Sequence, residues 1–130
     1  MKKIVLVAAL AAGFGTSAFA GGIGGTWKTQ TTDKGSYGHV QFRDCGGKFC
    51  AKLVKSFDGN GKQIFPAHLG KDIVKNMSDN GGGSFKGGTI WDPSADKVYS
   101  SKMSLSGKSL KVSGCVAKIL CKSQTWTRLK

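Results

Sequence analysis

The fold of this chain is constrained most strongly by an alternation of apolar and polar residues with a period of two. The alternation is clearest over residues 37–44, 49–53 and 110–116. Within the first of these stretches, Val40 and Phe42 fall on one side of the pattern. Such spacing is typical of β-strands that bury one face and expose the other. The chain is therefore expected to be mostly β-structure.

Turn signals separate the alternating stretches. Cys45–Lys48 and Ser106–Lys108 suit hairpin turns, and Asp92–Ala95 suits a type I turn. Seven strands are predicted, near residues 25–31, 36–44, 48–56, 84–91, 97–105, 108–116 and 119–128. Consecutive hairpins favour a sheet that closes on itself, because closure removes unpaired edges. The predicted fold class is all-β, a small antiparallel up-and-down barrel of about seven or eight strands.

One stretch departs from the two-residue period. Its apolar residues are spaced as on one face of a helix, and Pro66 suits a helix start. They include Leu69, Ile73, Val74 and Met77. A glycine-rich segment beginning at Asn80 would end such a helix. One short helix is therefore predicted within the one long connection.

The N-terminus has the layout of a cleavable signal peptide. Two lysines precede the apolar run 4–12, and Ala18-Phe19-Ala20 matches a small-x-small cleavage signal. The apolar run is shorter than the roughly 20 residues that span a bilayer. We expect residues 1–20 to be removed and residues 21–130 to form a single domain, periplasmic or secreted and not transmembrane after cleavage.

Four cysteines remain after residue 20: Cys45, Cys50, Cys115 and Cys121. An even count in an exported chain indicates disulfides, and four cysteines allow three connectivities. The two local pairs are favoured because each flanks a tight turn between predicted strands. One pair is spaced C-x₄-C and the other C-x₅-C. In an exported chain a zinc site is the lesser alternative to disulfides, and neither pair has the C-x-x-C spacing of a thioredoxin-type redox motif.

The charge balance is strongly basic, with 20 lysines and arginines against 7 acidic residues, all of them aspartate. Without Lys2 and Lys3 the net charge is +11. Such a charge attracts anions. The basic residues are dispersed and include only two arginines, whereas base readout favours arginine. Nucleic acid is not expected as a partner. Anionic envelope lipid or acidic polysaccharide suits the compartment better, and a merely soluble lysine-rich surface is the alternative.

No motif identifies catalytic or metal chemistry. Asp58–Gly61 resembles the start of a calcium loop, but the twelfth position, which needs an acidic ligand, is Leu69. The aspartates are not paired by any motif, and neither His39 nor His68 lies in a nucleophile context. The sequence predicts no cofactor, no metal and no enzyme, with a hydrolase as a minor alternative.

Aromatic residues occur in nearly all the predicted strands. In a closed sheet several of them must share one interior, either as ordinary core or as the wall of a ligand cavity. The candidate lining residues are Tyr37, Val40, Phe42, Phe85, Trp91, Tyr99 and Trp126. Small residues at expected inward positions would leave room for a partial cavity: Gly38, Ala51, Gly88 and Gly114.

Several motifs together resemble the DUF2147 family of exported bacterial proteins. They are Gly25-Thr26-Trp27-Lys28, the segment Cys45–Cys50, Gly87–Pro93 with Lys97 and Tyr99, Leu110–Cys115, and Leu120–Arg128. The resemblance covers almost the whole chain after residue 20, except that Lys62–Asn80 is shorter than the usual segment. It implies a lipocalin-like β-barrel of unknown function.

The resemblance also implies a structural role for three residues. In lipocalin-type barrels a G-x-W on the first strand packs against an arginine on the last, and Gly25, Trp27 and Arg128 occupy these places here. Two functions are then expected as alternatives. One is a periplasmic carrier for a small apolar or amphipathic anionic ligand. The other is an envelope-associated protein with a solid barrel that contacts anionic lipid or polysaccharide through its basic surface.

Overall fold

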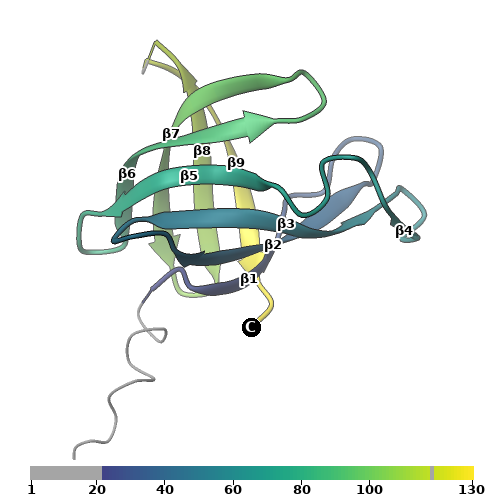
Figure 1. The fold of residues 1–130 in the computed structure, drawn as a ribbon, viewed down its shortest axis with the longest axis horizontal. Coiled ribbons are helices and arrows are strands. Elements are labelled where there is room, and N and C mark those ends of the chain that lie inside the picture. The colour runs from purple at the N-terminus through teal and green to yellow at the C-terminus, as the bar shows by residue number, and fades with distance from the viewer. Residues whose placement is uncertain (1–21, 118) are drawn as a thin grey trace, which may run out of the picture.

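The computed structural model describes residues 22–117 and 119–130, which are all-β (Figure 1). The expected signal peptide, residues 1–20, lies outside the described residues. The strands are β1 (Gly25–Lys28), β2 (Tyr37–Asp44), β3 (Phe49–Phe57), β4 (Gln63–Ile64), β5 (Asp72–Asp79), β6 (Ser84–Asp92), β7 (Lys97–Ser106), β8 (Ser109–Val116) and β9 (Leu120–Arg128). In the described part of the chain, no helix is long and apolar enough to span a bilayer.

Eight of these strands close into an antiparallel barrel. Around the ring, β1, β2, β3 and β5 to β9 each pair with their neighbours in sequence, and β9 returns to pair with β1. Trp27 of β1 lies opposite Arg128 of β9 at this closing seam. The short strand β4 lies outside this ring and pairs with the end of β3. The prediction of a closed up-and-down barrel is confirmed.

The predicted short helix is wrong, because residues 72–79 form β5. Between Val74 and Met77 this strand has two residues where the facing part of β3 has one, so β5 contains a β-bulge. Asn76 has a positive φ of 57° within the bulge. A bulge places inward residues three apart instead of two. The spacing of Val74 and Met77 therefore imitated a helical period.

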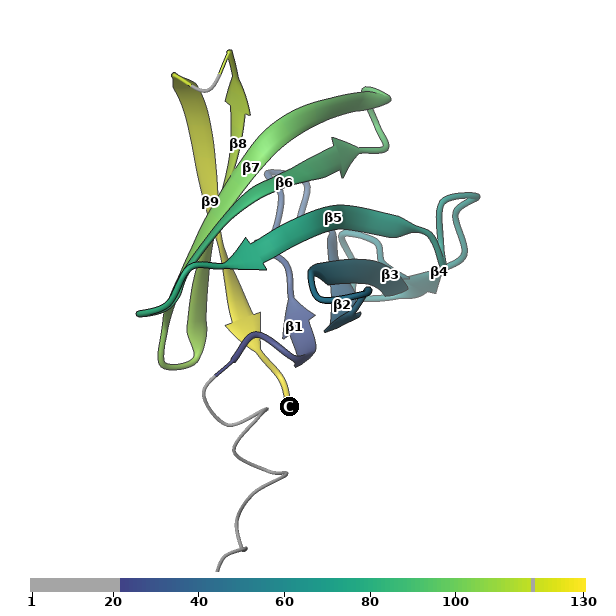
Figure 2. The same ribbon diagram turned by 60° about the vertical axis from the view of Figure 1, so that its left-hand side comes forward.

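The barrel has two different ends, which Figure 2 shows from the side. The closed end carries the β2–β3, β5–β6 and β7–β8 turns, together with the start of β1 and the end of β9. The open end carries the β1–β2, β6–β7 and β8–β9 connections and the long β3–β5 segment that contains β4. The connections at the open end include the longest segments between strands, so this end has the greater freedom to present a site.

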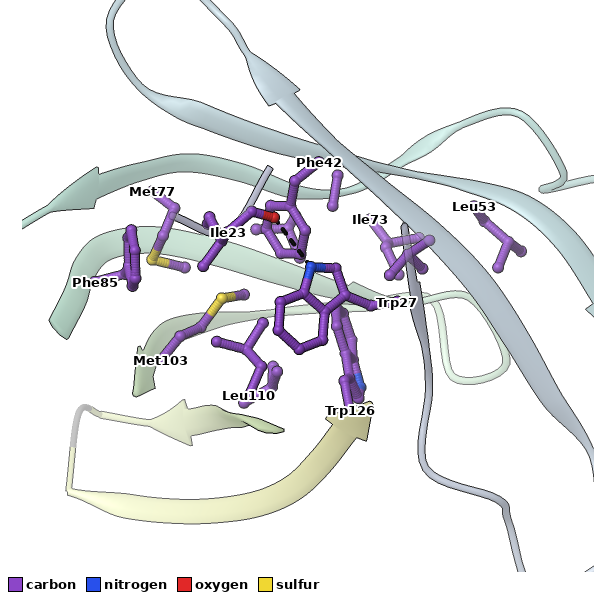
Figure 3. Packing of buried hydrophobic residues seen from close by; sticks show 14 residues of the cluster. Ile23, Trp27, Phe42, Leu53, Ile73, Met77, Phe85, Met103, Leu110 and Trp126 are labelled. Carbon is purple, nitrogen blue, oxygen red and sulfur yellow. Dashed lines mark hydrogen bonds between the residues drawn. The ribbon is translucent and has the colours of Figure 1, made fainter. Parts of the chain in front are cut away.

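A cluster of buried side chains packs inside the barrel, around Trp27 (Figure 3). Trp27, Trp126 and Phe85 are its largest fully buried members. Figure 3 shows Phe42, Met103 and Leu110 beside these rings. Each buried aromatic removes a large apolar area from water, so the cluster is the main source of stability in this fold.

Both local disulfides are present. Cys45–Cys50 closes the β2–β3 turn at the closed end. Cys115–Cys121 closes the β8–β9 turn at the open end. The favoured connectivity is confirmed, and each bridge stiffens one hairpin.

Candidate functional site

The closed end of the barrel is occupied by protein. The Arg128 guanidinium carbon lies 4.4 Å from the centroid of the Trp27 ring. Arg128 donates hydrogen bonds to the carbonyl of Gly24 at 2.8 Å and to that of Gly22. The Trp27 indole N–H donates to the Ile23 carbonyl at 3.0 Å. These contacts hold the segment before β1 across this end of the barrel.

Gly25 lies within the same arrangement. Its φ is 113°, a conformation that side chains disfavour, and a Cβ there would collide with the carbonyl of Lys130. The Lys130 carbonyl accepts a hydrogen bond from the Thr26 amide at 2.9 Å. Gly25 therefore allows the chain terminus to pack against the start of β1.

The predicted lining residues divide into two groups. Val40, Phe42, Phe85 and Trp126 are buried in the core cluster. Trp91 and Tyr99 lie toward the open end and are partly exposed, and Tyr37 is treated separately below. The residues available to a ligand are therefore those near the open end.

The room expected beside the small inward residues is filled. A Cβ on Gly38 would lie 2.7 Å from a methyl group of Leu53, and one on Gly114 would lie 3.2 Å from Ile90. A Cβ on Gly88 would meet the backbone of β5 at Lys75. These three glycines are therefore sites of close packing, and neighbouring atoms occupy the space expected beside them.

A groove of about 550 Å³ lies instead at the open end, where β5 and β6 diverge. The last pair of these strands toward the open end is Val74 with Ile90. The groove is lined by residues of β5, β6 and β7 and of the segment before β5, among them Lys71, Ile73, Lys75, Thr89, Trp91 and Val98. It combines an apolar and aromatic wall with two ammonium groups.

The Trp91 ring forms one wall of this groove, and two contacts fix its position. Its indole N–H donates to the Asp96 carboxylate at 3.0 Å. The His68 ring meets the Trp91 ring edge to face, with centroids 6.3 Å apart. Trp91, one of the predicted lining residues, packs against the core cluster and also lines this groove, opposite Val98 in the strand register.

Asp72 lines the groove, and its carboxylate is paired with Arg43, which is not among the lining residues. Asp72 accepts two hydrogen bonds from the Arg43 guanidinium, at 2.7 and 2.9 Å. Among the described residues, 22–117 and 119–130, this is the side-chain ion pair that forms. Neither Lys71 nor Lys75 takes part in it. The groove therefore presents net positive charge beside an apolar wall.

Replacing Asp72 with asparagine is expected to flatten the acid side of the stability profile. Hydrogen bonding to Arg43 lowers the pKa of the Asp72 carboxyl. A lowered pKa in the folded state stabilises the fold above the unfolded-state value of about 3.9, and this stabilisation is lost as the pH falls through the folded-state pKa. Urea unfolding between about pH 2 and 6 should give the wild type a larger free energy of unfolding than Asp72→Asn near pH 6. This difference should shrink as the pH falls toward about 2. A gap independent of pH would contradict the assignment.

A second aromatic cluster lies on the outer face. Tyr37 stacks on Phe57 with ring centroids 4.8 Å apart, and His39 lies 4.9 Å from the same ring. The Lys28 ammonium lies 4.4 Å from the Tyr37 centroid. Lys28 and His39 form the strand pair next to that of the inward Trp27. Because successive side chains of a strand point to opposite faces, Lys28 and His39 point away from the interior. Tyr37 was expected inside the barrel, but it packs on its outer surface.

The environment of His39 favours a neutral ring. Burial lowers the pKa of His39, and the positive charges of Lys55 and Lys28 lower it further. In the described part of the chain, neither this histidine nor His68 hydrogen-bonds to a serine through its ring. The two imidazoles belong to separate aromatic contacts.

The segment that resembles a calcium loop forms a polar turn. The Asp58 carboxylate accepts hydrogen bonds from the amides of Asn60 and Lys62, at 2.9 and 3.0 Å. Within the described residues, no three histidine, cysteine or acidic side chains gather as metal ligands. The Asp58 carboxylate is therefore used to hold the turn through backbone amides of the same loop.

Sequence reasoning did not identify Lys71, Ile73, Lys75 or Val98 as site residues. Three of them lie in the stretch that was predicted to be a helix, and Val98 lies in the strand predicted near residues 97–105. A usable signal is present in Lys71–Lys75, where two lysines flank an apolar pair. The divergence of β5 from β6, which turns this stretch into a groove, has no counterpart in the sequence pattern.

Comparison with known proteins places this barrel in context. A search of curated proteins finds no relative with significant sequence similarity. Among solved structures, the fold is similar to that of protein HP1028 from Helicobacter pylori, described as belonging to the lipocalin family. The TM-score is 0.68 at 21% identity, and the match covers 84% of each chain. This likeness concerns the fold.

The family assignment comes from the sequence itself. Residues 25–128 match the family model described as an uncharacterized protein conserved in bacteria, DUF2147. The match runs from the glycine that begins β1 to the arginine that ends β9, so it spans the whole barrel. The chain belongs to the DUF2147 family.

Proposed function

We propose that this protein is an exported binding protein that holds a small amphipathic anion in the groove at its open end. The observation that carries the proposal is the pairing of two lysines with an aromatic and apolar wall in one groove. Its volume of about 550 Å³ falls within the range of small-molecule sites, roughly 300–1,000 Å³. The groove therefore matches a ligand in both size and chemistry.

The two sides of the groove set the orientation of the ligand. The anionic group is placed near Lys71 and Lys75, which are not engaged by the Asp72 carboxylate because Arg43 holds it. The apolar part lies against Ile73 and Trp91. A neutral ligand of the same length would leave both lysines without a partner, so charge is part of the selectivity.

The architecture and the cysteines support this role. Barrels of about eight strands are either filled or hold one small ligand, as in lipocalins. Here a core cluster packs the interior around Trp27, so we place the ligand in the groove at the open end. Disulfides persist in oxidising compartments, and residues 1–20 have the layout of a signal peptide. Both features support export to the periplasm or beyond.

Laurate is expected to bind the processed protein and to change the fluorescence of Trp91, whereas dodecanol should bind more weakly. The change should disappear in Trp91→Phe, because Trp27 and Trp126 are buried in the core. The double variant Lys71→Gln/Lys75→Gln should weaken laurate binding roughly fivefold, since exposed ion pairs contribute modestly. Isothermal titration gives the affinities, and intact mass shows whether residues 1–20 are removed.

A matched charge control is Lys48→Gln/Lys86→Gln, two exposed lysines away from the groove. This variant has the same net charge as the groove variant, so general electrostatic attraction is equal in the two. If both variants lost laurate affinity equally, the ligand would be attracted by overall charge and the groove proposal would fail. Absence of laurate binding to the wild type would also refute it.

A further inference from the structure

The tip of the β8–β9 hairpin carries an unusual set of exposed apolar side chains. The described residues of this tip are 116, 117, 119 and 120, among which Val116 is 55%, Ile119 81% and Leu120 75% exposed. Val98 on the neighbouring strand β7 is 64% exposed. Val98 and Val116 line one shallow groove. In Figure 2 the ends of β8 and β9 project beyond the body of the barrel, away from the C-terminus.

This tip is held in shape by covalent and hydrogen-bonded contacts. The Cys115–Cys121 disulfide closes it, and Cys115 and Cys121 are also partners in the strand register. Val116 and Leu120 form the next pair toward the tip. The apolar side chains are therefore displayed on a preformed hairpin, and binding through them costs little ordering entropy.

All the charged side chains in the strands beside and within the tip are basic. From residue 97 to residue 130 the sequence contains seven lysines, one arginine and no acidic residue. All seven aspartates precede this segment. Lys97 flanks the groove beside the tip, and Lys122 directly follows Cys121. Exposed lysines continue along the outer side of β7 and β8 at Lys102 and Lys111.

Apolar insertion and positive charge are the two signals that together hold a protein at an anionic bilayer. A narrow tip with three exposed apolar side chains suits the boundary between head groups and acyl chains. It is too small to form the roughly 800 Å² per partner of a stable protein interface. We propose that the β8–β9 tip docks this protein on anionic membrane surfaces, with Ile119 and Leu120 inserted and the lysines of β7–β9 against the head groups.

Vesicle flotation tests this docking directly. The processed protein should float with vesicles of equal parts phosphatidylcholine and phosphatidylglycerol, and much less with phosphatidylcholine alone. Ile119→Ser/Leu120→Ser should lower partitioning onto the mixed vesicles by about tenfold, because two apolar side chains no longer enter the bilayer. Lys97→Gln/Lys122→Gln should lower it by roughly tenfold as well, and added salt should weaken wild-type binding.

Matched controls separate the tip from general stickiness. Leu129→Ser removes an exposed leucine at the closed end and should leave flotation unchanged. Thermal melts should show that the tip variants remain folded, since the replaced side chains are exposed. Unchanged flotation of Ile119→Ser/Leu120→Ser, or equal flotation with neutral vesicles, would overturn the proposal. So would tighter binding to alginate, an acidic polysaccharide, than to the mixed vesicles.

The tip and the laurate groove are tested independently. The groove beside Trp91 shares Val98 with the apolar surface beside the tip, but Val116, Ile119 and Leu120 do not line it. Laurate affinity should therefore be the same in Ile119→Ser/Leu120→Ser as in the wild type. If laurate does not bind, the groove proposal fails and the membrane-docking proposal is unaffected. If the protein does not float with the mixed vesicles, the docking proposal fails and the groove proposal is unaffected.

Discussion

Truncating Trp27 to alanine is expected to lower the free energy of unfolding by about 3–5 kcal/mol. Its side chain is fully buried and lies at the centre of the cluster in Figure 3. The loss combines the apolar area returned to water with the cavity left among rings that can only partly collapse. It also frees the Ile23 carbonyl, which accepts the indole N–H, and removes the ring beneath Arg128.

Equilibrium urea unfolding, followed by circular dichroism, measures this effect. Trp91→Ala is the matched control, because it removes the same side chain from a partly exposed position at the open end. Its cost should be clearly smaller, since less area and less cavity are involved. Equal losses for Trp27→Ala and Trp91→Ala would contradict the placement of Trp27 in the buried core and of Trp91 at a partly exposed position.

The barrel itself was predictable because its inward positions repeat with a period of two. Seven of the observed strands fall near their predicted ranges, and they pair antiparallel in chain order except that β5 lies between β3 and β6. Closure was also foreseeable, since an open sheet of this kind would leave two unpaired edges. The closing contact of Trp27 with Arg128 was anticipated only through resemblance to lipocalin-type barrels.

β5 and the groove were not predictable, for one shared reason. The bulge at Asn76 breaks the period of two, so a strand was read as a helix. The divergence of β5 from β6 depends on pairing between distant segments, which the local pattern does not report. The close packing around Gly38 and Gly114 was missed for a related reason: a glycine shows that a side chain is absent, and the neighbours decide whether the space is filled.

The tip at Ile119 illustrates a different limit. The sequence between Cys115 and Cys121 is apolar enough to be read as the end of a buried strand, and periodicity alone does not separate a buried end from an exposed one. Only the structure shows that Ile119 and Leu120 are exposed, in the connection where the ends of β8 and β9 project beyond the barrel (Figure 2). The absence of acidic residues after Asp96 was visible in the sequence from the start, but its meaning depends on that exposure.

Replacing Arg128 with alanine is expected to cost roughly 2–4 kcal/mol, from two charge-assisted hydrogen bonds and a cation–π contact at a partly buried position. The carbonyls of Gly22 and Gly24 would lose their donor, and the segment before β1 would lose its link to β9. Arg128→Lys should recover little of this loss, because a single ammonium cannot reproduce the planar fork that stacks on Trp27 and reaches both carbonyls.

A double-mutant cycle gives this closure its sharpest test. Because the Arg128 guanidinium lies over the Trp27 ring, each single substitution already removes their contact, and the double variant should lose about 1 kcal/mol less than the two single losses added. The matched control combines Trp27→Ala with Arg43→Ala, which removes the other arginine from an exposed pair on β2 and β5. That combination should be additive, because Arg43 does not contact Trp27. Additivity in both cycles would mean that the first and last strands are not joined through these two side chains.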